Sequence, residues 1–293
     1  MSTTPLLTLA LLHDGQPGGF SWTRWEIHPS VALGCALFIG LYFWATGPLA
    51  RRRGWSGSRQ THETGFFLAG VAVLFLALNG PLHDLSDYYL FSAHMVQHML
   101  LMMVFPALLL LGLPAYVLRP LLTGGGRERL ARTLTHPATA FVVYNVVLIG
   151  WHFPALYNWA LVNHDVHVAQ HLLFIGAATL MWWPIVDPLP ELARMGSLLK
   201  MLYIFAFGIP MSVVSAFITM ASGAVYPWYI EAPRLFGLTA LEDQQLGGLI
   251  MWIPGMLIYW SVVSVIFLRY SAREERDEPL EEGVPREWVR AGA

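Results

Sequence analysis

Seven long apolar stretches, separated by short charged loops, limit what this chain can fold into. Each stretch is long enough to cross a bilayer as an α-helix, which needs about 20 apolar residues. Backbone groups inside lipid must be hydrogen-bonded within their own segment, so helices are expected. The sequence therefore predicts an all-α integral membrane protein, a bundle of seven transmembrane helices. The expected spans cover residues 30–50, 66–82, 89–113, 137–158, 165–186, 199–222 and 246–268.

The seven stretches are expected to form one membrane domain with a polar segment at each end. Residues 1–29 are predicted to be an external N-terminal segment, residues 30–270 the seven-helix domain, and residues 271–293 a charged cytoplasmic tail. Within the domain, the sequence Asn79-Gly80-Pro81 is expected to end the second span early, because glycine and proline disfavour a helix interior.

Composition excludes several classes of protein. Hydrophobic residues make up 56% of the chain and charged residues 12%, about half the fraction of about 25% typical of soluble domains. A soluble globular enzyme and a disordered chain are therefore excluded, and membrane lipid is the expected surrounding. The net charge is −2 and no basic stripe is present, so nucleic acid is not an expected partner. The single cysteine, Cys35, rules out an intramolecular disulfide framework and a paired-thiolate metal site.

Basic residues predict the orientation of the bundle. Of the 17 Lys and Arg residues, 15 fall in alternate loops or after the last span, all on one side of the membrane. Arg24 and Arg234 fall on the other side. The positive-inside rule then predicts that the N-terminus lies outside and the C-terminus lies in the cytoplasm.

Histidines gather at one depth of this predicted bundle. His94 and His98 are four residues apart, and His167 and His171 repeat that spacing in the fifth span. Residues four apart lie on one helical face, and both pairs are expected in the outer halves of their spans. His152 approaches the same layer from the fourth span. Ionisable residues inside a membrane are costly and usually face a bundle interior or a water-filled cavity.

Imidazoles at this spacing are able to ligate one metal ion. Imidazole suits copper, zinc and iron, and nearby methionine thioethers favour copper, so copper is the expected metal. We predict metal ligation by His94, His98, His152, His167 and His171. Groups expected to guide a metal into the pocket or to support its ligands are His83, Asp84, His164, Asp243 and Gln244. Asp243 is alternatively an N-cap of the seventh span, with close helix packing at Gly247-Gly248. Two other interpretations stay open for the same histidines, namely a proton path and a polar packing network.

Four motifs resemble a known family. They are HMVQHM in the third span, GWHFPALYNWA in the fourth, HDVHVAQH leading into the fifth and DQQLGGLIMWIPG in the seventh. Together they are similar to the multi-pass CtaG family of cytochrome c oxidase assembly factors, over roughly residues 30–270. The family's motif histidines correspond to His94, His98, His152, His164, His167 and His171.

The resemblance implies a protein of the bacterial plasma membrane that is needed to assemble haem-copper oxidases of the caa type, with an oxidase subunit as partner. A role in copper supply is inferred in that family, and related chains are fused to copper-import domains. The favoured hypothesis is a non-catalytic assembly factor that holds copper in an outward-facing histidine pocket. The alternatives are a haem-binding or redox membrane protein and a copper or proton transporter that uses the same histidines.

Overall fold

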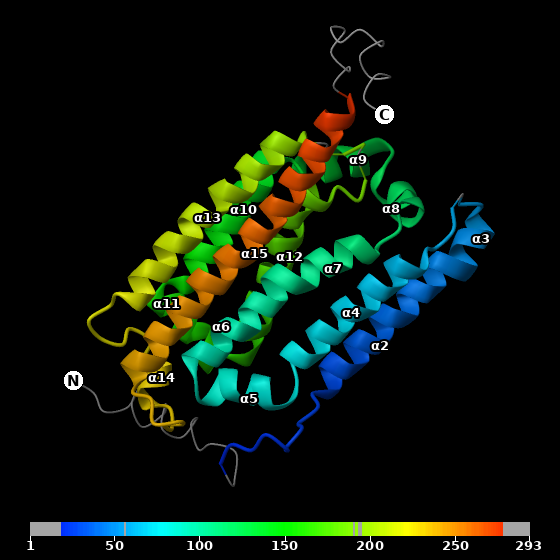
Figure 1. The fold of residues 1–293 in the computed structure, drawn as a ribbon. Helices are drawn as coiled ribbons and strands as arrows, with labels where there is room; N and C mark the ends of the chain where they lie inside the picture. Colours follow the sequence, from blue (N-terminus) through cyan, green and yellow to red (C-terminus); the bar gives the residue numbers. More distant parts are fainter. Residues whose placement is uncertain (1–18, 56, 190, 193–194, 278–293) are drawn as a thin grey trace, which may run out of the picture.

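The structure, a computed structural model, describes residues 19–55, 57–189, 191–192 and 195–277. These residues form a bundle of long helices, with no strand among them (Figure 1). The first helices are α2 (Pro29–Trp44), α3 (Ala50–Arg53), α4 (Thr61–Ala77), α5 (Gly80–Tyr88), α6 (Phe91–Met99), α7 (Phe105–Gly112) and α8 (Ala115–Leu122). They are followed by α9 (Gly125–Leu134), α10 (Pro137–His152), α11 (Pro154–Val162), α12 (His164–Val186), α13 (Ser197–Thr219), α14 (Pro227–Glu231) and α15 (Ala240–Asp277).

Five helical stretches of the described residues are long and apolar enough to cross a membrane. The number rises to seven if each of two bent pairs of helices is one span. These pairs are α4 with α5, bent by 45°, and α9 with α10, bent by 61°. The all-helical prediction is confirmed, and the two bent pairs contain most of the predicted spans 66–82 and 137–158. The five stretches are Pro29–Arg53, Phe91–Gly112, His164–Val186, Ser197–Thr219 and Ala240–Glu274.

Two predicted spans are interrupted where glycine or proline occurs. Helix α4 ends at Ala77, Asn79 is extended, and Gly80, the first residue of α5, adopts a φ of +67°. A Cβ on Gly80 would lie 2.6 Å from the ring of Trp25, so both the backbone and the packing require glycine. The predicted fourth span, 137–158, is also divided. Its helix ends at His152 because Pro154 forces the preceding residue out of the helical conformation.

Proline also explains a widened helical turn in the centre of the bundle. Residues Leu100–Val104 form a π-helical turn, η2, between α6 and α7, and Pro106 follows it directly. Proline lacks the N–H that would bond to the carbonyl of Met102, four residues earlier. The indole Nε1 of Trp182 on α12 donates to that carbonyl instead, at 3.0 Å. A second π-helical turn, η1 (Ala45–Leu49), contains Pro48.

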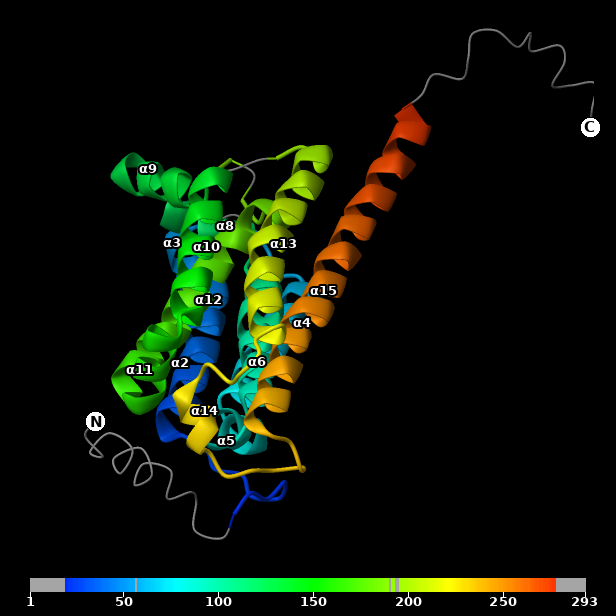
Figure 2. The same ribbon diagram turned by 90° about the vertical axis from the view of Figure 1, so that its left-hand side faces the viewer.

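The two ends of the bundle differ. Helices α5, α11 and α14 lie at one end, which we call the α5 end (Figure 2). Helices α3, α8 and α9 and the C-terminal end of α15 lie at the other, the α9 end. Most of the basic residues from the alternate loops are on these last four elements, so the structure gathers them at one end, as the sequence predicts. Which side of the membrane each end faces stays a prediction.

The sides of the bundle present large apolar residues. Leu33 on α2 is 70% exposed, Phe217 on α13 is 77% exposed and Leu268 on α15 is 65% exposed. Apolar surface spread over several helices in this way is typical of a protein surrounded by lipid hydrocarbon. With the five apolar helices, it indicates a membrane protein.

Candidate functional site: a buried cluster of histidines

Two helices bring four of the predicted histidines together near the α5 end. His94 and His98 come from α6, and His167 and His171 come from α12; all four are buried. The ring centroids of His94 and His98 are 4.0 Å apart, and those of His167 and His171 are 4.4 Å apart. Across the helices, His94 lies 5.6 Å from His167, and His98 lies 5.3 Å from His171. We call these four residues the histidine cluster.

A carboxylate from α5 joins the cluster. Oδ2 of Asp87 lies 3.8 Å from Nδ1 of His167 and 3.5 Å from Nε2 of His83. Asp87, His94 and His167 each offer one ligand atom, and these atoms all lie within 4.8 Å of one another. Such spacing allows one metal ion to be bound by two imidazoles and one carboxylate after small side-chain movements.

The cluster contains ring nitrogens that no protein group satisfies. Both ring nitrogens of His98 and Nε2 of His94, His167 and His171 are buried without a hydrogen-bond partner among the described residues. Most buried polar atoms in native proteins are hydrogen-bonded, and a group left unpaired needs an explanation. Several such nitrogens within one group of side chains are explained if a ligand binds there.

Hydrogen bonds to neighbouring groups fix which nitrogen of His94 faces the cluster. The hydroxyl of Tyr229 on α14 donates to the carbonyl of Ser86 at 2.5 Å, so its oxygen accepts from Nδ1–H of His94 at 3.1 Å. Burial raises the pKa of the Tyr229 phenol well above its ordinary value, which keeps the hydroxyl protonated. His94 is therefore held with a free lone pair on Nε2, the form that a metal requires.

His83 is oriented in a similar way at the edge of the cluster. The amide Nε2 of Gln97 donates to the carbonyl of Ala77 at 2.8 Å and to Nδ1 of His83 at 3.0 Å. Nε2 of His83 then carries the hydrogen that points to Asp87. His83 thus contacts the carboxylate of the site and is partly exposed.

Comparison with known proteins identifies the family to which this chain belongs. The sequence profile of the cytochrome c oxidase caa3 assembly factor family matches residues 40–273, most of the chain. The chain belongs to this family. That match confirms the resemblance inferred from the motifs, two of which lie on α6 and α12, the helices that carry the histidine cluster.

Longer mycobacterial proteins are also similar. Uncharacterized protein Mb0105 of Mycobacterium bovis and uncharacterized protein MT0111 of Mycobacterium tuberculosis are each 30% identical over 278 residues, covering 87% of this chain and 40% of each relative. Uncharacterized protein ML1998 of Mycobacterium leprae is 30% identical over 213 residues, covering 64% of this chain and 31% of its own length. The chain thus spans two fifths or less of these curated relatives. No solved structure matches it.

In this member of the caa3 assembly factor family, the fifth predicted ligand lies apart from the other four. His152 ends α10, and its Nδ1–H donates to the carbonyl of Leu148 at 2.6 Å, which leaves Nε2 buried and unpaired. The ring of Phe174 contacts both histidines, since its centroid lies 6.2 Å from that of His152 and 4.8 Å from that of His98. Asp84 and His164, which were also predicted for the site, differ from each other in burial. Asp84 is buried with Oδ2 unpaired, whereas His164, the first residue of α12, is exposed.

Asp243 and Gln244 on α15 contact backbone rather than the histidine cluster. Asp243 accepts from the amides of Phe91 and Ser92, at 2.7 and 3.1 Å, and from the Ser92 hydroxyl at 2.5 Å. These amides are the first of α6, so Asp243 caps the helix that carries His94 and His98. Gln244 accepts from the amide of Val225 and donates to the carbonyl of Ile218. Asp243 therefore supports the site by holding the start of α6, whereas Gln244 joins α15 to Ile218 on α13 and to Val225.

Asp87 and Tyr229 are the residues that the sequence analysis did not place in the site. Asp87 follows His83 by four residues, a helical spacing that could have indicated their pairing. Tyr229 is 135 residues from His94 in the chain, and no sequence pattern indicates this contact.

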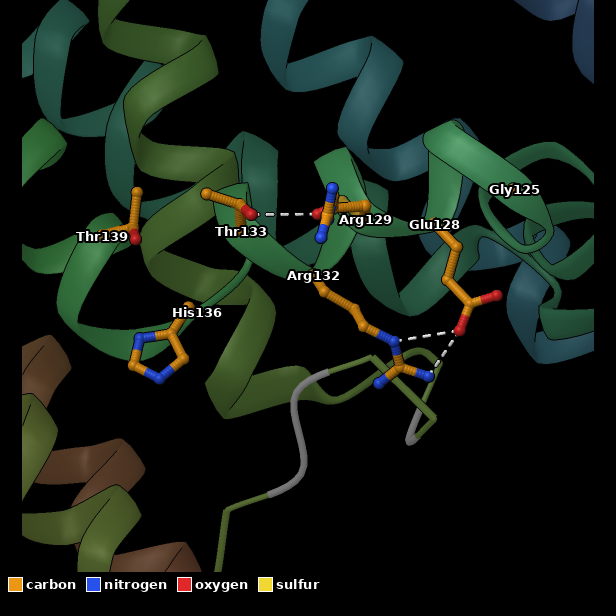
Figure 3. Close-up of a pocket in the computed structure, with 7 residues that line it drawn as sticks. All are labelled: Gly125, Glu128, Arg129, Arg132, Thr133, His136 and Thr139. Carbon is orange, nitrogen blue, oxygen red and sulfur yellow. Dashed lines mark hydrogen bonds and ion pairs between the residues drawn. The ribbon is translucent and has the colours of Figure 1, made fainter.

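A wide surface depression at the α9 end is less suited to a metal ion than the histidine cluster. It has a volume of about 550 Å³ and is lined by side chains that include Arg129, Arg132 and His136 (Figure 3). Arg132 is already paired with Glu128 at 2.6 Å. Two arginines beside a single carboxylate disfavour a metal cation, so the histidine cluster is the candidate metal site.

Proposed function

We propose that this chain binds copper at Asp87 and the histidine cluster and supplies it to a haem-copper oxidase of the caa3 type during assembly. The observation that carries the proposal is the set of unpaired, buried ring nitrogens on four adjacent histidines. Imidazole is a good ligand for copper in both oxidation states, and metals provide the partner that these nitrogens lack. Membership in the caa3 assembly factor family supplies the process that needs the copper.

The donor set suits an ion that must later be released. Cysteine thiolates bind Cu(I) tightly, but the one cysteine of this chain, Cys35, is on α2 and packs with Tyr42, Phe67 and Val71, away from the site. The cluster therefore offers neutral imidazoles and one carboxylate. Because such ligands bind Cu(I) less strongly than thiolates, transfer to an oxidase subunit is favoured.

The orientation proposed for the bundle determines where the copper site lies in the cell. If the arginine-rich α9 end faces the cytoplasm of a bacterial cell, the α5 end and its histidine cluster lie near the outer face of the plasma membrane. Asp87 and His83 are partly exposed there, and they offer a path by which copper reaches the buried rings.

A pair of variants tests the proposal in cells that lack the natural chain. We expect His94→Ala/His167→Ala to lower the copper content and activity of the caa3 oxidase, because both rings and the adjoining Asp87 site are lost. The matched control is His62→Ala, since His62 is an exposed histidine on α4. Chain abundance is measured by immunoblot in every strain.

Two results would contradict the proposal. One is a normal oxidase in the double variant. The other is a drop in the abundance of the variant chain while the remaining protein binds copper as the wild type does. A Soret band in the purified chain would instead indicate haem, and copper flux into vesicles would indicate transport.

A further inference from the structure

A small internal cavity lies beside the histidine cluster. It has a volume of about 10 Å³ and is lined by His98, His152, Tyr144 and Leu148 together with six methionines. We call the two histidines and six methionines the methionine chamber. Its methionines are Met95, Met99, Met102, Met103, Met211 and Met251.

Half of the 12 methionines of the chain line this one cavity. They come from four separate elements, namely α6, η2, α13 and α15. The π-helical turn η2 contributes Met102 and Met103, and such turns often occur at functional sites. Methionines repeated along one face of a single helix would not produce this arrangement, because the thioethers come from distant parts of the sequence.

A glycine makes room for two of the thioethers. A Cβ on Gly255 of α15 would lie 2.8 Å from Cε of Met211 and 3.3 Å from Cε of Met99. Met99 and Met211 therefore approach each other across the backbone of Gly255. Replacing this glycine would move the two side chains without removing a sulfur atom.

Unpaired nitrogens distinguish the chamber from an ordinary apolar core. Methionine is a common filler of cores, and on its own would indicate only packing. Two residues that line the chamber, however, have ring nitrogens that are buried without a partner among the described residues, namely both nitrogens of His98 and Nε2 of His152. An apolar core would not leave three imidazole nitrogens unpaired, because each costs about 1–3 kcal/mol.

The chemistry of the chamber selects a soft cation of low charge. Thioether and neutral imidazole suit Cu(I), and neither a carboxylate nor a thiolate lines the cavity. The electrostatic cost of burying an ion rises with the square of its charge, so a divalent ion is disfavoured without a negative ligand. The histidine cluster differs from the chamber because the carboxylate of Asp87 supplies a negative charge beside it.

We propose that the methionine chamber is a second copper site, which receives Cu(I) from the histidine cluster through His98. This inference rests on the proposed function. His98 belongs to both sites, because its ring lies 4.0 Å from His94 and also lines the chamber. The ion passes between them by exchange of neutral ligands, with no change of oxidation state.

Cu(I) loading of the full-length chain, purified in detergent under anaerobic conditions, tests the inference. X-ray absorption at the copper edge should show both nitrogen and sulfur ligands in the wild type. We expect Met99→Leu/Met211→Leu to lose sulfur scattering and to bind Cu(I) at least about tenfold more weakly. Removing even a group that only orients a metal ligand typically weakens binding by about that factor. Leucine nearly conserves the volume of methionine, so the fold is preserved.

The matched control is Met181→Leu, because Met181 is fully buried but does not line the chamber. Gly255→Ala provides a second variant that keeps every donor and should also weaken the sulfur signal. Asp87→Asn/His167→Ala should retain sulfur scattering, since it alters only the histidine cluster.

The outcomes separate the two proposals. Nitrogen ligands alone in the wild type would overturn the methionine chamber and leave copper binding at the histidine cluster intact. Sulfur scattering that survives both Met99→Leu/Met211→Leu and Gly255→Ala would also overturn it. A wild-type chain that binds no Cu(I) would contradict both proposals.

Discussion

Replacement of Asp243 by alanine should destabilise the bundle and loosen the copper site together. The carboxylate accepts hydrogen bonds from the first two amides of α6 and from the Ser92 hydroxyl. Alanine leaves the two amides, of Phe91 and Ser92, buried without an acceptor. Each stranded donor costs about 1–3 kcal/mol, so the loss of folding free energy is about 2–6 kcal/mol.

Thermal unfolding of the purified chain in detergent measures this loss. For a soluble domain of similar size, 1 kcal/mol shifts the melting temperature by about 2–4 °C, so a decrease on the order of 10 °C is expected. Asp243→Asn is the graded control, because its amide keeps one acceptor oxygen and should lose about half as much. Copper affinity should fall in the same order, since His94 and His98 follow on the same helix.

Two results would refute this reasoning. An unchanged melting temperature in Asp243→Ala would show that the cap contributes little to holding α6. Loss of copper without loss of stability would show that Asp243 acts on the metal site directly rather than through the backbone.

Three further substitutions have defined outcomes. Gly247→Ala would place a Cβ 2.3 Å from the ring of Phe91, and this overpacking should lower stability by about 1–3 kcal/mol in chemical unfolding; wild-type stability would contradict the close packing. Tyr229→Phe removes the acceptor for Nδ1–H of His94 and should weaken copper binding about 10–100-fold in a chelator competition, whereas unchanged affinity would contradict the assigned orientation of the ring. Asp87→Asn should weaken binding of Cu(II) more than binding of Cu(I), because the negative charge matters most for the divalent ion. Equal effects in parallel titrations of the two ions would show that the carboxylate is not a metal ligand.

The sequence predicted the helices better than their interruptions. Apolar stretches of sufficient length predict helices that are able to cross a bilayer, and five helices of the described residues, or seven if each bent pair is one span, meet that condition. The division at Phe153 depends on Pro154 and was not predicted, although the residue before a proline disfavours a helix. The turn η2 was not predicted either, although Pro106 is visible in the sequence; the contact of Trp182 with the carbonyl of Met102 depends on packing between helices.

Helical spacing predicted the central part of the candidate site. Residues four apart share a face, so the pairing of His94 with His98 and of His167 with His171 follows from the sequence alone. Contacts between helices follow no such rule. The approach of Tyr229 to His94 is an example, because it depends on how α14 packs against α6.

The close packing of α15 against its neighbours was predicted more accurately than the role of Asp243 as a helix cap. The sequence Gly247-Gly248 indicated a close approach of helices, and a Cβ at Gly248 would lie 2.3 Å from Oγ1 of Thr219. Asp243 was considered as a cap for its own helix or as a support for the site. Instead, it caps α6, because the packing that the glycines permit places the start of α15 against the start of α6.

The most direct test of the central claim is the metal content of the purified chain and of a variant of the histidine cluster. After mild loading with copper, zinc and iron and removal of free metal, elemental analysis should find copper bound to the wild type. His98→Ala/His171→Ala should lose most of it and remain folded. Copper that is absent from the wild type, or retained in full by this variant, would contradict the claim that the cluster is a copper site.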